Sequence, residues 1–274
     1  MSMVSLKQEL TKEEHIKPTP LKIKVLHEDA NILAIDKPSG IMVHPDGRED
    51  PSKKIRASKT ILDLFIKKYP KLEIVHRLDK DTSGVMLLVK NKKAHEFLKQ
   101  QFQNREIKKV YNTIVSGWVK NDHGILTKPI GRSPSDFRRW LAGRGARGTL
   151  RDAVTEYKVL KRFEAKNAEV FPRSSLSRVR DGSHTDKKLR HSLLSKFTYL
   201  EIKPKTGRTH QIRVHMKYLN HPVVCDALYD PNGPCPKDIK RMALHAVSIE
   251  FKDLKGKTIK VESKLPKEFR KVLK

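Results

Sequence analysis

Short apolar segments separated by Asp, Gly and Pro run through most of the chain. LKIKVLHED begins at Leu21 and is followed by NILAIDKP and GIMVHP, so the pattern predicts three strands before a charged loop at 47–58. The segment VMLLV at 85–89 is apolar throughout, which is typical of a strand buried on both faces. Because every apolar run is of strand length, none reaches the roughly 18 to 20 residues that cross a bilayer.

Helices are expected among these strands, but without a regular alternation. Apolar residues recur at helical spacing across 60–69 and again from Ala94 to Phe102. TGRTHQIRVHMKYL predicts a turn that leads into a third helix, and PKEFRKVL a terminal one. Irregular alternation favours an α+β fold with a mixed, mainly antiparallel sheet in two packed lobes. The further strands are expected in KKVYNTIVSGWV, AVTEYKVLKRF, FTYLEIKP, LHAVSIEF and KTIKVES.

The pattern divides the chain into a polar tail at 1–20 and one body at 21–274, which two basic insertions interrupt. Residues 131–151 hold six arginines and one acid, with two aromatic residues between them, and this mixture suits phosphate pairing and base stacking. Residues 164–195 are rich in Ser, Lys and Arg, which predicts a mobile loop. A solvated charged surface would also explain both insertions.

Lys and Arg outnumber Asp and Glu by 59 to 31, and the resulting net charge of +28 favours a polyanionic partner such as nucleic acid. No signal-peptide stretch opens the chain, so we expect a cytoplasmic protein.

Cys225 and Cys235 lack metal-ligand spacing, which predicts two reduced thiols and neither a zinc site nor a disulfide. The glycines at 143, 145 and 148 have the spacing of a dinucleotide-binding loop, but no apolar strand precedes them.

Two polar segments carry the candidate chemistry. In VHRLDKDTSG, Asp79 stands between Arg77 and Lys80 in a loop between apolar strands, where nearby cations favour the charged carboxylate that a nucleophile requires. A simple turn would explain this segment as well. In TGRTHQIR, the polar residues around His210 could hold a phosphate or a carboxylate, and ordinary helix capping explains them almost equally well. Tyr111 is either a core residue or a platform on which a base stacks.

Five segments between residues 27 and 251 resemble the RluA-like family of RNA pseudouridine synthases, in the same order. HRLDKDTSG resembles the catalytic loop of that family and HEDANILAIDKPSGIMVHP its opening strands. The other three resemblances are KKVYNTIVSGWV to its tyrosine strand, KPKTGRTHQIRVHMKYLNHPVV to its arginine segment, and RMALHAVSIEF to its closing strand. The resemblance implies the pseudouridine synthase fold, with a catalytic cleft, and isomerisation of specific uridines in structured rRNA or tRNA.

The resemblance also implies roles for individual residues. Asp79 would act as the nucleophile or glycosidic-bond catalyst at the sugar of the target uridine. Tyr111 would pack against the target base and assist proton removal at carbon 5, and Arg213 would pair with Asp79 and keep it charged. Arg77 would fill the gap that the flipped uridine leaves in the RNA. Further RNA contacts are expected from Lys37, His76, Arg208, His210, Gln211, Arg138, Arg139, Arg144 and Arg147.

An isomerisation without redox change needs no metal, nucleotide or organic cofactor, so we expect none. We further expect an RNA partner, no membrane association and a monomer. The chain departs from the family in two places: no S4-type RNA-binding domain is expected ahead of the body, and Cys225 stands where a glycine is common. Two other functions remain open, namely a catalytically silent RNA-binding or ribosome-associated module, and a nuclease or nucleoside hydrolase that uses His76 and Asp79.

Overall fold

The computed structural model describes residues 23–44, 60–166 and 194–274. The predicted tail at 1–20, the charged loop at 47–58 and most of the second basic insertion lie outside these ranges. Within the described ranges, no helix is both long and apolar enough to span a membrane.

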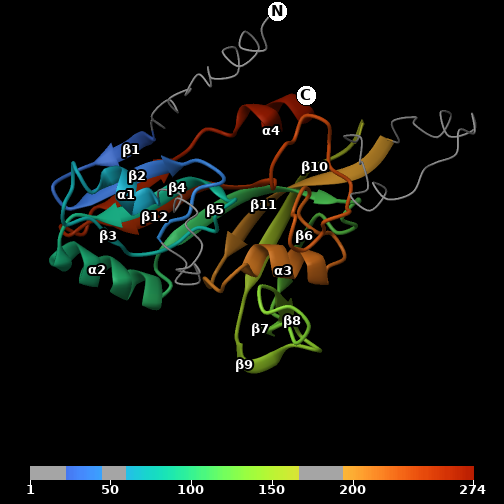
Figure 1. The fold of residues 1–274 in the computed structure, drawn as a ribbon, viewed down its shortest axis with the longest axis horizontal. Coiled ribbons are helices and arrows are strands. Elements are labelled where there is room, and N and C mark those ends of the chain that lie inside the picture. The colour runs from blue at the N-terminus through green and yellow to red at the C-terminus, as the bar shows by residue number, and fades with distance from the viewer. Residues whose placement is uncertain (1–22, 45–59, 167–193) are drawn as a thin grey trace, which may run out of the picture.

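A ten-stranded sheet runs the length of the molecule (Figure 1). Its strands are β1 (Lys24–Glu28), β2 (Ile32–Lys37), β3 (Glu73–Ile74), β4 (Ser83–Val89), β5 (Lys108–Ser116), β6 (His123–Leu126), β10 (Thr155–Lys166), β11 (Leu194–Pro204), β12 (Leu244–Lys252) and β13 (Thr258–Glu262). The order is β1-β2-β4-β12-β5-β11-β10-β6, with β3 beside β4 and β13 beside β12. Among the strands of the described ranges, β4 and β12 pair in parallel and the other pairs of this sheet are antiparallel. The mixed, mainly antiparallel sheet expected from the sequence is confirmed.

The first lobe packs one helix on each face of β2 and β4. The helix α2 (Lys92–Gln103) buries Ala94 and Leu98 against even-numbered residues of β2 such as Ile32, whereas α1 (Ile61–Phe65) buries Ile61 against odd-numbered ones such as Leu33. Successive strand residues point to opposite faces, so both faces of these strands lie in the core. This explains the uninterrupted apolar run in β4.

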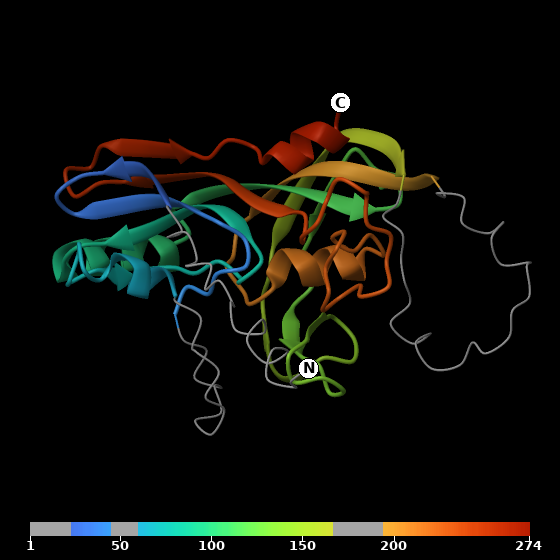
Figure 2. The ribbon, with the colours of Figure 1, turned by 45° about the horizontal axis from the view of Figure 1, so that its top comes forward.

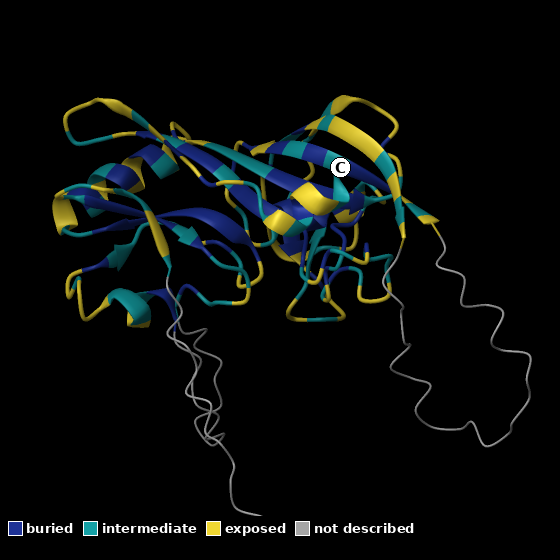
Figure 3. Ribbon diagram, turned by 90° about the horizontal axis from the view of Figure 1, so that it is seen from above, coloured by how far each residue is buried: buried dark blue, intermediate teal, exposed yellow. Residues whose placement is uncertain are grey.

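The second lobe repeats this arrangement around β5 and β11. The helix α3 (Gln211–Tyr218) packs Ile212 and Met216 with Leu200, while α4 (Lys267–Val272) packs Phe269 with Phe197 on the other face. Figure 2 shows α3 beneath the sheet and α4 above it. The strands of the central sheet are largely buried, and the exposed residues gather in its loops and outer strands (Figure 3).

The first basic insertion forms a small antiparallel sheet of its own, which projects from the second lobe (Figure 1). Its strands are β7 (Ile130–Arg132), β8 (Trp140–Ala142) and β9 (Arg147–Arg151), in the order β8-β7-β9. Ala142 packs with Val214 of α3 and with Tyr229, so this sheet is attached to the body through an apolar contact. Gly143 and Gly145 lie between β8 and β9, and Gly148 lies in β9.

Three predictions about local structure are wrong. GIMVHP is not a strand in its described residues, 40–44, where the Met42 carbonyl accepts a hydrogen bond from the amide of Ile61 in α1. The helix expected over 60–69 ends at Phe65, and residues 66–68 form turns. The loop expected over 164–195 is shorter at both ends, because β10 and β11 pair as far as Lys166 and Leu194.

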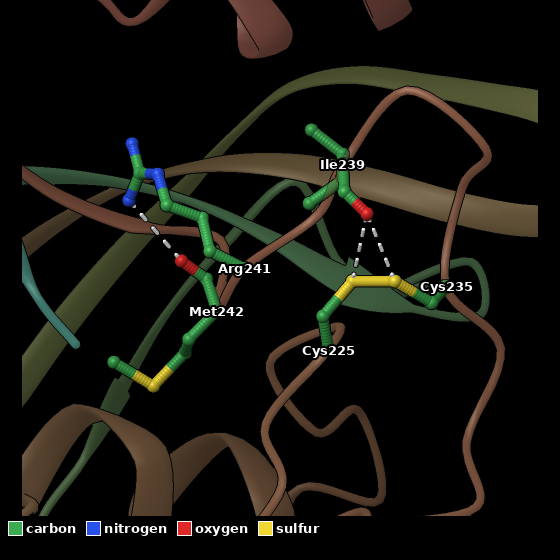
Figure 4. The surroundings of a disulfide bond; sticks show 5 residues. All are labelled: Cys225, Cys235, Ile239, Arg241 and Met242. Atoms are coloured by element: carbon green, nitrogen blue, oxygen red, sulfur yellow. Dashed lines mark hydrogen bonds between the residues drawn. A yellow bond between two sulfur atoms is a disulfide. The ribbon is translucent and has the colours of Figure 1, made fainter. Parts of the chain in front are cut away.

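The two cysteines form a disulfide, which corrects the expectation of reduced thiols (Figure 4). The chain turns back between them, so that Cys225 and Cys235 lie with their Cα atoms 5.2 Å apart although ten positions separate them. Both sulphur atoms face the carbonyl oxygen of Ile239 (Figure 4). Spacing along the sequence could not predict this pairing, because it depends on the reversal of the chain.

Candidate active site

The loop between β3 and β4 is supported from beneath by Lys37. The Lys37 side chain is fully buried, and its Nζ donates to the carbonyl oxygens of Pro38, Lys80 and Thr82 at 3.0, 2.8 and 2.9 Å. Burial lowers the pKa of Lys37 to about 8. The predicted contact of Lys37 with RNA is therefore wrong: all three donors of the ammonium group are used to shape the loop that carries Asp79.

Gly84 brings the two lobes together directly after this loop. It has a φ of +109°, and a Cβ at this position would collide with the backbone of Ala246 on β12. Only glycine tolerates both this backbone conformation and so close an approach. The parallel pairing of β4 with β12 thus begins at Ser83 and Gly84, and it holds Asp79 at the boundary between the lobes.

Arg213, in the first turns of α3, reaches across this boundary to Asp79. Its Nη1 donates to Asp79 Oδ2 at 3.1 Å, while Nε and Nη2 donate to the two oxygens of Asp226 at 2.7 and 2.8 Å. Burial by itself lowers the pKa of Arg213, but the hydrogen bonds and charge of Asp226, and then those of Asp79, raise it overall. The guanidinium group is therefore a fixed cation between two carboxylates.

Asp226 is the residue of this arrangement that sequence reasoning missed. Its side chain is 1% exposed, and Oδ1 also accepts hydrogen bonds from the amides of Leu228 and Tyr229, both at 3.0 Å. The preceding residue, Cys225, has a φ of +57°, a conformation that a glycine adopts more readily. The unusual cysteine in VVCDALYD was a signal that this turn is specialised.

Tyr229 connects three parts of the second lobe at the edge of the site. Its hydroxyl accepts from the amide of Trp140 on β8 and lies 2.9 Å from His210 Nδ1, and the Arg213 guanidinium lies over its ring. His210 Nε2 is 4.0 Å from Asp79 Oδ2. Burial lowers the pKa of His210 although the charge of Asp79 acts in the opposite direction, so a neutral ring faces Asp79 near neutral pH.

Gln211 and Arg208 are engaged with the protein itself. Gln211 is 4% exposed; its amide donates to Val154 and Thr155, and its oxygen accepts from the Thr206 hydroxyl and the Arg208 amide. The predicted contact of Gln211 with RNA is therefore wrong, because every polar atom of the side chain is used within the turn. Arg208 donates through Nε to the Asp152 carbonyl and lines the cavity described next.

Two cavities meet at Asp79. The first, of about 580 Å³, lies between β5 and residues 204–213, and the second, of about 780 Å³, lies beside residues 225–228 and 240–242. The residues that line both are Arg77, Leu78, Asp79, His210 and Arg213. An aromatic wall is confined to the first cavity, whereas Lys80, Arg138, Lys240 and Arg241 line only the second. Four cations line only the first cavity as well, namely Arg105, Lys109, Lys205 and Arg208, so the aromatic wall is what distinguishes it as a pocket for a base.

Tyr111 and His76 belong to the first cavity. Burial, together with the charge of Asp79, raises the pKa of Tyr111, so its phenol is protonated near neutral pH. His76 Nε2 accepts a hydrogen bond from the Leu87 amide at 2.9 Å, and its ring packs against Phe102. Burial, and then the charge of Lys109, lower the pKa of His76 to about 3. A neutral His76 therefore holds the loop to β4 at the wall of this cavity.

Of the four arginines around the small sheet that were expected to contact RNA, one lines a cavity at Asp79 and three do not. Arg138 lines the second cavity and forms two hydrogen bonds with Asp136, at 3.0 and 2.8 Å. Arg139 lies 3.5 Å from the same carboxylate and lines neither cavity. Arg144 and Arg147 are exposed on the sheet and are likewise away from both cavities. In the described part of the chain, no group of three or more His, Cys, Asp or Glu side chains is placed to hold a metal ion.

Comparisons with known proteins show which proteins the chain resembles. The family model for RNA pseudouridylate synthase matches residues 31–218. An RNA pseudouridine synthase of Aquifex aeolicus is 36% identical over 82% of this chain and 61% of its own length. The ribosomal large subunit pseudouridine synthase D of Xanthomonas campestris is 32% identical over 96% of this chain and 72% of its own length.

Solved structures of the family share the fold. The human RNA pseudouridylate synthase domain containing 4 matches with a TM-score of 0.62 and 26% identity over 91% of both chains. The human domain containing 1 matches with a TM-score of 0.67 and 21% identity, and covers 90% of this chain and 85% of that one. The chain therefore belongs to the RNA pseudouridylate synthase family, whose members are isomerases.

Proposed function

We propose that this protein isomerises specific uridines of ribosomal RNA to pseudouridine, with Asp79 as the catalytic nucleophile. The observation that carries the proposal is the position of the Asp79 carboxylate, which lies where the two cavities meet and is held by Arg213 at 3.1 Å. A nucleophile needs a charged oxygen, a fixed direction and access to its substrate. Asp79 meets these requirements at the boundary between the lobes.

The two oxygens of Asp79 are differently occupied. Oδ2 accepts the hydrogen bond from Arg213, while Oδ1 makes no hydrogen bond with any residue in the described ranges. The side chain is 20% exposed. One oxygen is thus available to approach carbon 1′ of the target ribose while Arg213 fixes the orientation of the other.

The first cavity suits the target base. Tyr111 forms part of its wall, with Leu78 and Leu244 nearby, so a uracil turned out of the RNA would stack on an aromatic ring beside two apolar side chains. Arg77 is exposed next to Asp79 and makes no hydrogen bond or ion pair within the described ranges. This leaves its guanidinium group available to occupy the space that the flipped uridine vacates.

The basic surfaces and the relatives support an RNA substrate, and ribosomal RNA in particular. The Xanthomonas relative is named for the large ribosomal subunit, and so is a relative from Borreliella burgdorferi that is 31% identical over 97% of this chain. Lys80 and Lys240 are exposed at the second cavity, where they can face phosphates of the strand that flanks the target. Mapping the pseudouridines lost from cellular RNA when the gene is removed would identify the uridine.

The Asp79→Asn variant tests the nucleophile, with Asp81→Asn as its matched control. Asp81 is an exposed neighbour in the same loop, and among the described residues its one hydrogen bond is made by its carbonyl oxygen, which accepts from the Ser39 hydroxyl. We expect Asp79→Asn to abolish pseudouridine formation, measured by carbodiimide reactivity and mass spectrometry of treated RNA, and Asp81→Asn to retain it. RNA affinity should be similar in both.

Each rival function gives a different result in this assay. Isomerisation leaves the length and the mass of the RNA unchanged. A nuclease would shorten the RNA and a nucleoside hydrolase would release uracil. A silent binding module would leave the RNA unmodified with the wild-type protein, and full activity of Asp79→Asn would refute the role of Asp79.

A further inference from the structure

Lys109 lies in the first cavity beside Tyr111. Both residues belong to β5 and are two positions apart, so their side chains leave the same face of the strand. Both line the cavity of about 580 Å³ that ends at Asp79. The neighbouring Lys108 points the other way, with its side chain 76% exposed and paired with Glu250.

The charge of Lys109 has little compensation from the protein. Its Nζ donates to the carbonyl oxygen of Thr206 at 3.3 Å, and within the described ranges no carboxylate lies within 4.0 Å of it. Burial lowers the pKa of Lys109 to about 8. Lys37 is fully buried, whereas Lys109 is half-buried, and Lys37 has three carbonyl acceptors. Since an ammonium group has three donors, Lys109 retains two that no described residue accepts.

Two other cations that line this cavity, Arg77 and Arg105, are exposed, and the remaining three are held by protein groups. Arg213 is held by Asp226 and Asp79, Lys205 pairs with Glu156, and Arg208 donates to a backbone carbonyl. Lys109 is only partly exposed, and a cation that is partly withdrawn from water without a full set of partners costs free energy; such groups gather at functional sites. Lys109 is therefore positioned for a partner that the free protein does not contain.

We propose that Lys109 is a catalytic residue that donates a hydrogen bond to a carbonyl oxygen of the target uracil and stabilises the negative charge of the detached base. The inference rests on the proposed function, because it requires a uracil in the first cavity. It adds a residue to Asp79, Tyr111 and Arg213.

The chemistry of the isomerisation creates the charge that Lys109 would meet. When the bond between carbon 1′ and nitrogen 1 breaks, its electron pair stays with the uracil and spreads over nitrogen 1 and the carbonyl oxygens, while Asp79 takes up carbon 1′. Carbon 5 then bonds to carbon 1′ and loses its proton, Asp79 is released, and nitrogen 1 ends protonated, so that the product is an isomer. A donor that the protein fixes beside the developing charge stabilises such an anion.

Three variants separate this role from a structural one. Lys109→Met removes the charge and keeps the length of the side chain, Lys109→Arg keeps a charge, and Lys108→Met is the control on the opposite face of β5. We expect Lys109→Met to lower the single-turnover rate constant by about 100-fold to 1,000-fold, the usual effect of losing one such donor. The Kd for RNA should change by less than about threefold, since one donor deep in a base pocket adds little to affinity that phosphate contacts dominate. Lys109→Arg should recover part of the rate, and Lys108→Met should match the wild type.

Sulphur substitution in the RNA identifies the contact directly. Sulphur accepts hydrogen bonds poorly. We therefore expect the single-turnover rate constant of the wild-type protein to fall on target RNA in which sulphur replaces one uracil oxygen, either at carbon 2 or at carbon 4. Lys109→Met should show no additional loss on that same RNA, as in a double-mutant cycle. Should the methionine variant fail to fold, Lys109→Gln serves for both measurements.

Two results would overturn the inference. One is a rate constant of Lys109→Met within about threefold of the wild type, less than 1 kcal/mol of barrier. The other is a loss of rate on sulphur-substituted RNA that is the same in the wild type and in Lys109→Met, both for sulphur at carbon 2 and for sulphur at carbon 4 of the uracil. If the wild-type protein forms pseudouridine and Asp79→Asn does not, either result refutes the role of Lys109 and leaves the proposed function intact.

Discussion

The Asp226→Asn substitution tests whether the buried partner of Arg213 organises the site. Asn keeps one oxygen, which can still accept from the amides of Leu228 and Tyr229 at the position of Oδ1. Its amide nitrogen would replace Oδ2, which accepts from Arg213 Nε at 2.7 Å. Two donors would then face each other, and the 7% exposed guanidinium group would lose its principal counter-charge.

The size of the effect follows from this loss. Removing one partner of a buried ion pair costs about 3 to 5 kcal/mol, because the other charge is left uncompensated. For a protein of this size, about 2 to 4 °C of Tm corresponds to 1 kcal/mol, so the Tm should fall by roughly 6 to 20 °C. The rate at 25 °C should fall by about 10-fold to 100-fold, because Arg213 no longer aims Asp79 accurately.

Thermal unfolding and single-turnover assays of the same preparations measure both effects. Asp230→Asn is the matched control, since Asp230 lies in the same segment and its pair with Lys217 is long, at 3.7 Å, and partly exposed. It should change the free energy of unfolding by at most about 1 kcal/mol. A Tm of Asp226→Asn within about 2 °C of the wild type, less than 1 kcal/mol on the same scale, would refute the reasoning.

Three further predictions follow from the contacts of the site. Lys37→Met should lower the free energy of unfolding by about 3 kcal/mol, because it leaves buried carbonyls without a donor, and denaturant unfolding would measure this. The folded-state pKa of His76 is about 3, below the ordinary value of 6.5, so the unfolded state binds an extra proton between these values and stability falls as pH drops below about 6.5. In acid unfolding, the free energy of unfolding of His76→Asn should fall less steeply with decreasing pH than that of the wild type. A pH profile of stability identical to that of the wild type would contradict this. Arg144→Gln together with Arg147→Gln should reduce the slope of log K for RNA against log salt by about 2 if both contact phosphates, and no change would exclude such contacts.

The residues of the candidate site were accessible from the sequence where they form continuous motifs. HRLDKDTSG marks the loop, TGRTHQIR marks the arginine segment, and Tyr111 stands in a strand with clear alternation. The strands of the sheet were also largely predictable, since VMLLV and its neighbours can only be strands or short buried segments at that length. Their roles in catalysis stay predictions until the variants are assayed.

Polar residues were misjudged where their partners are distant in the chain. Lys37 and Gln211 have the composition of RNA contacts, yet the structure places both inside the protein, where backbone carbonyls and hydroxyls use all their donors. A sequence shows which donors exist, but the acceptors lie up to 57 positions away in these two cases. Burial decides between the two uses, and burial is a property of the packed lobes.

The sequence by itself determined the alternation of strands and helices, the basic charge, and the order of the motifs, because periodicity and residue chemistry are local. Only the tertiary structure decided that Asp226 shares Arg213 with Asp79, that Cys225 pairs with Cys235, and that the small arginine-rich sheet is anchored beside the site. These contacts join segments that the turns around 225–235 and the junction of β4 with β12 bring together. Their energies depend on burial and on distance, which exist only once the chain has folded.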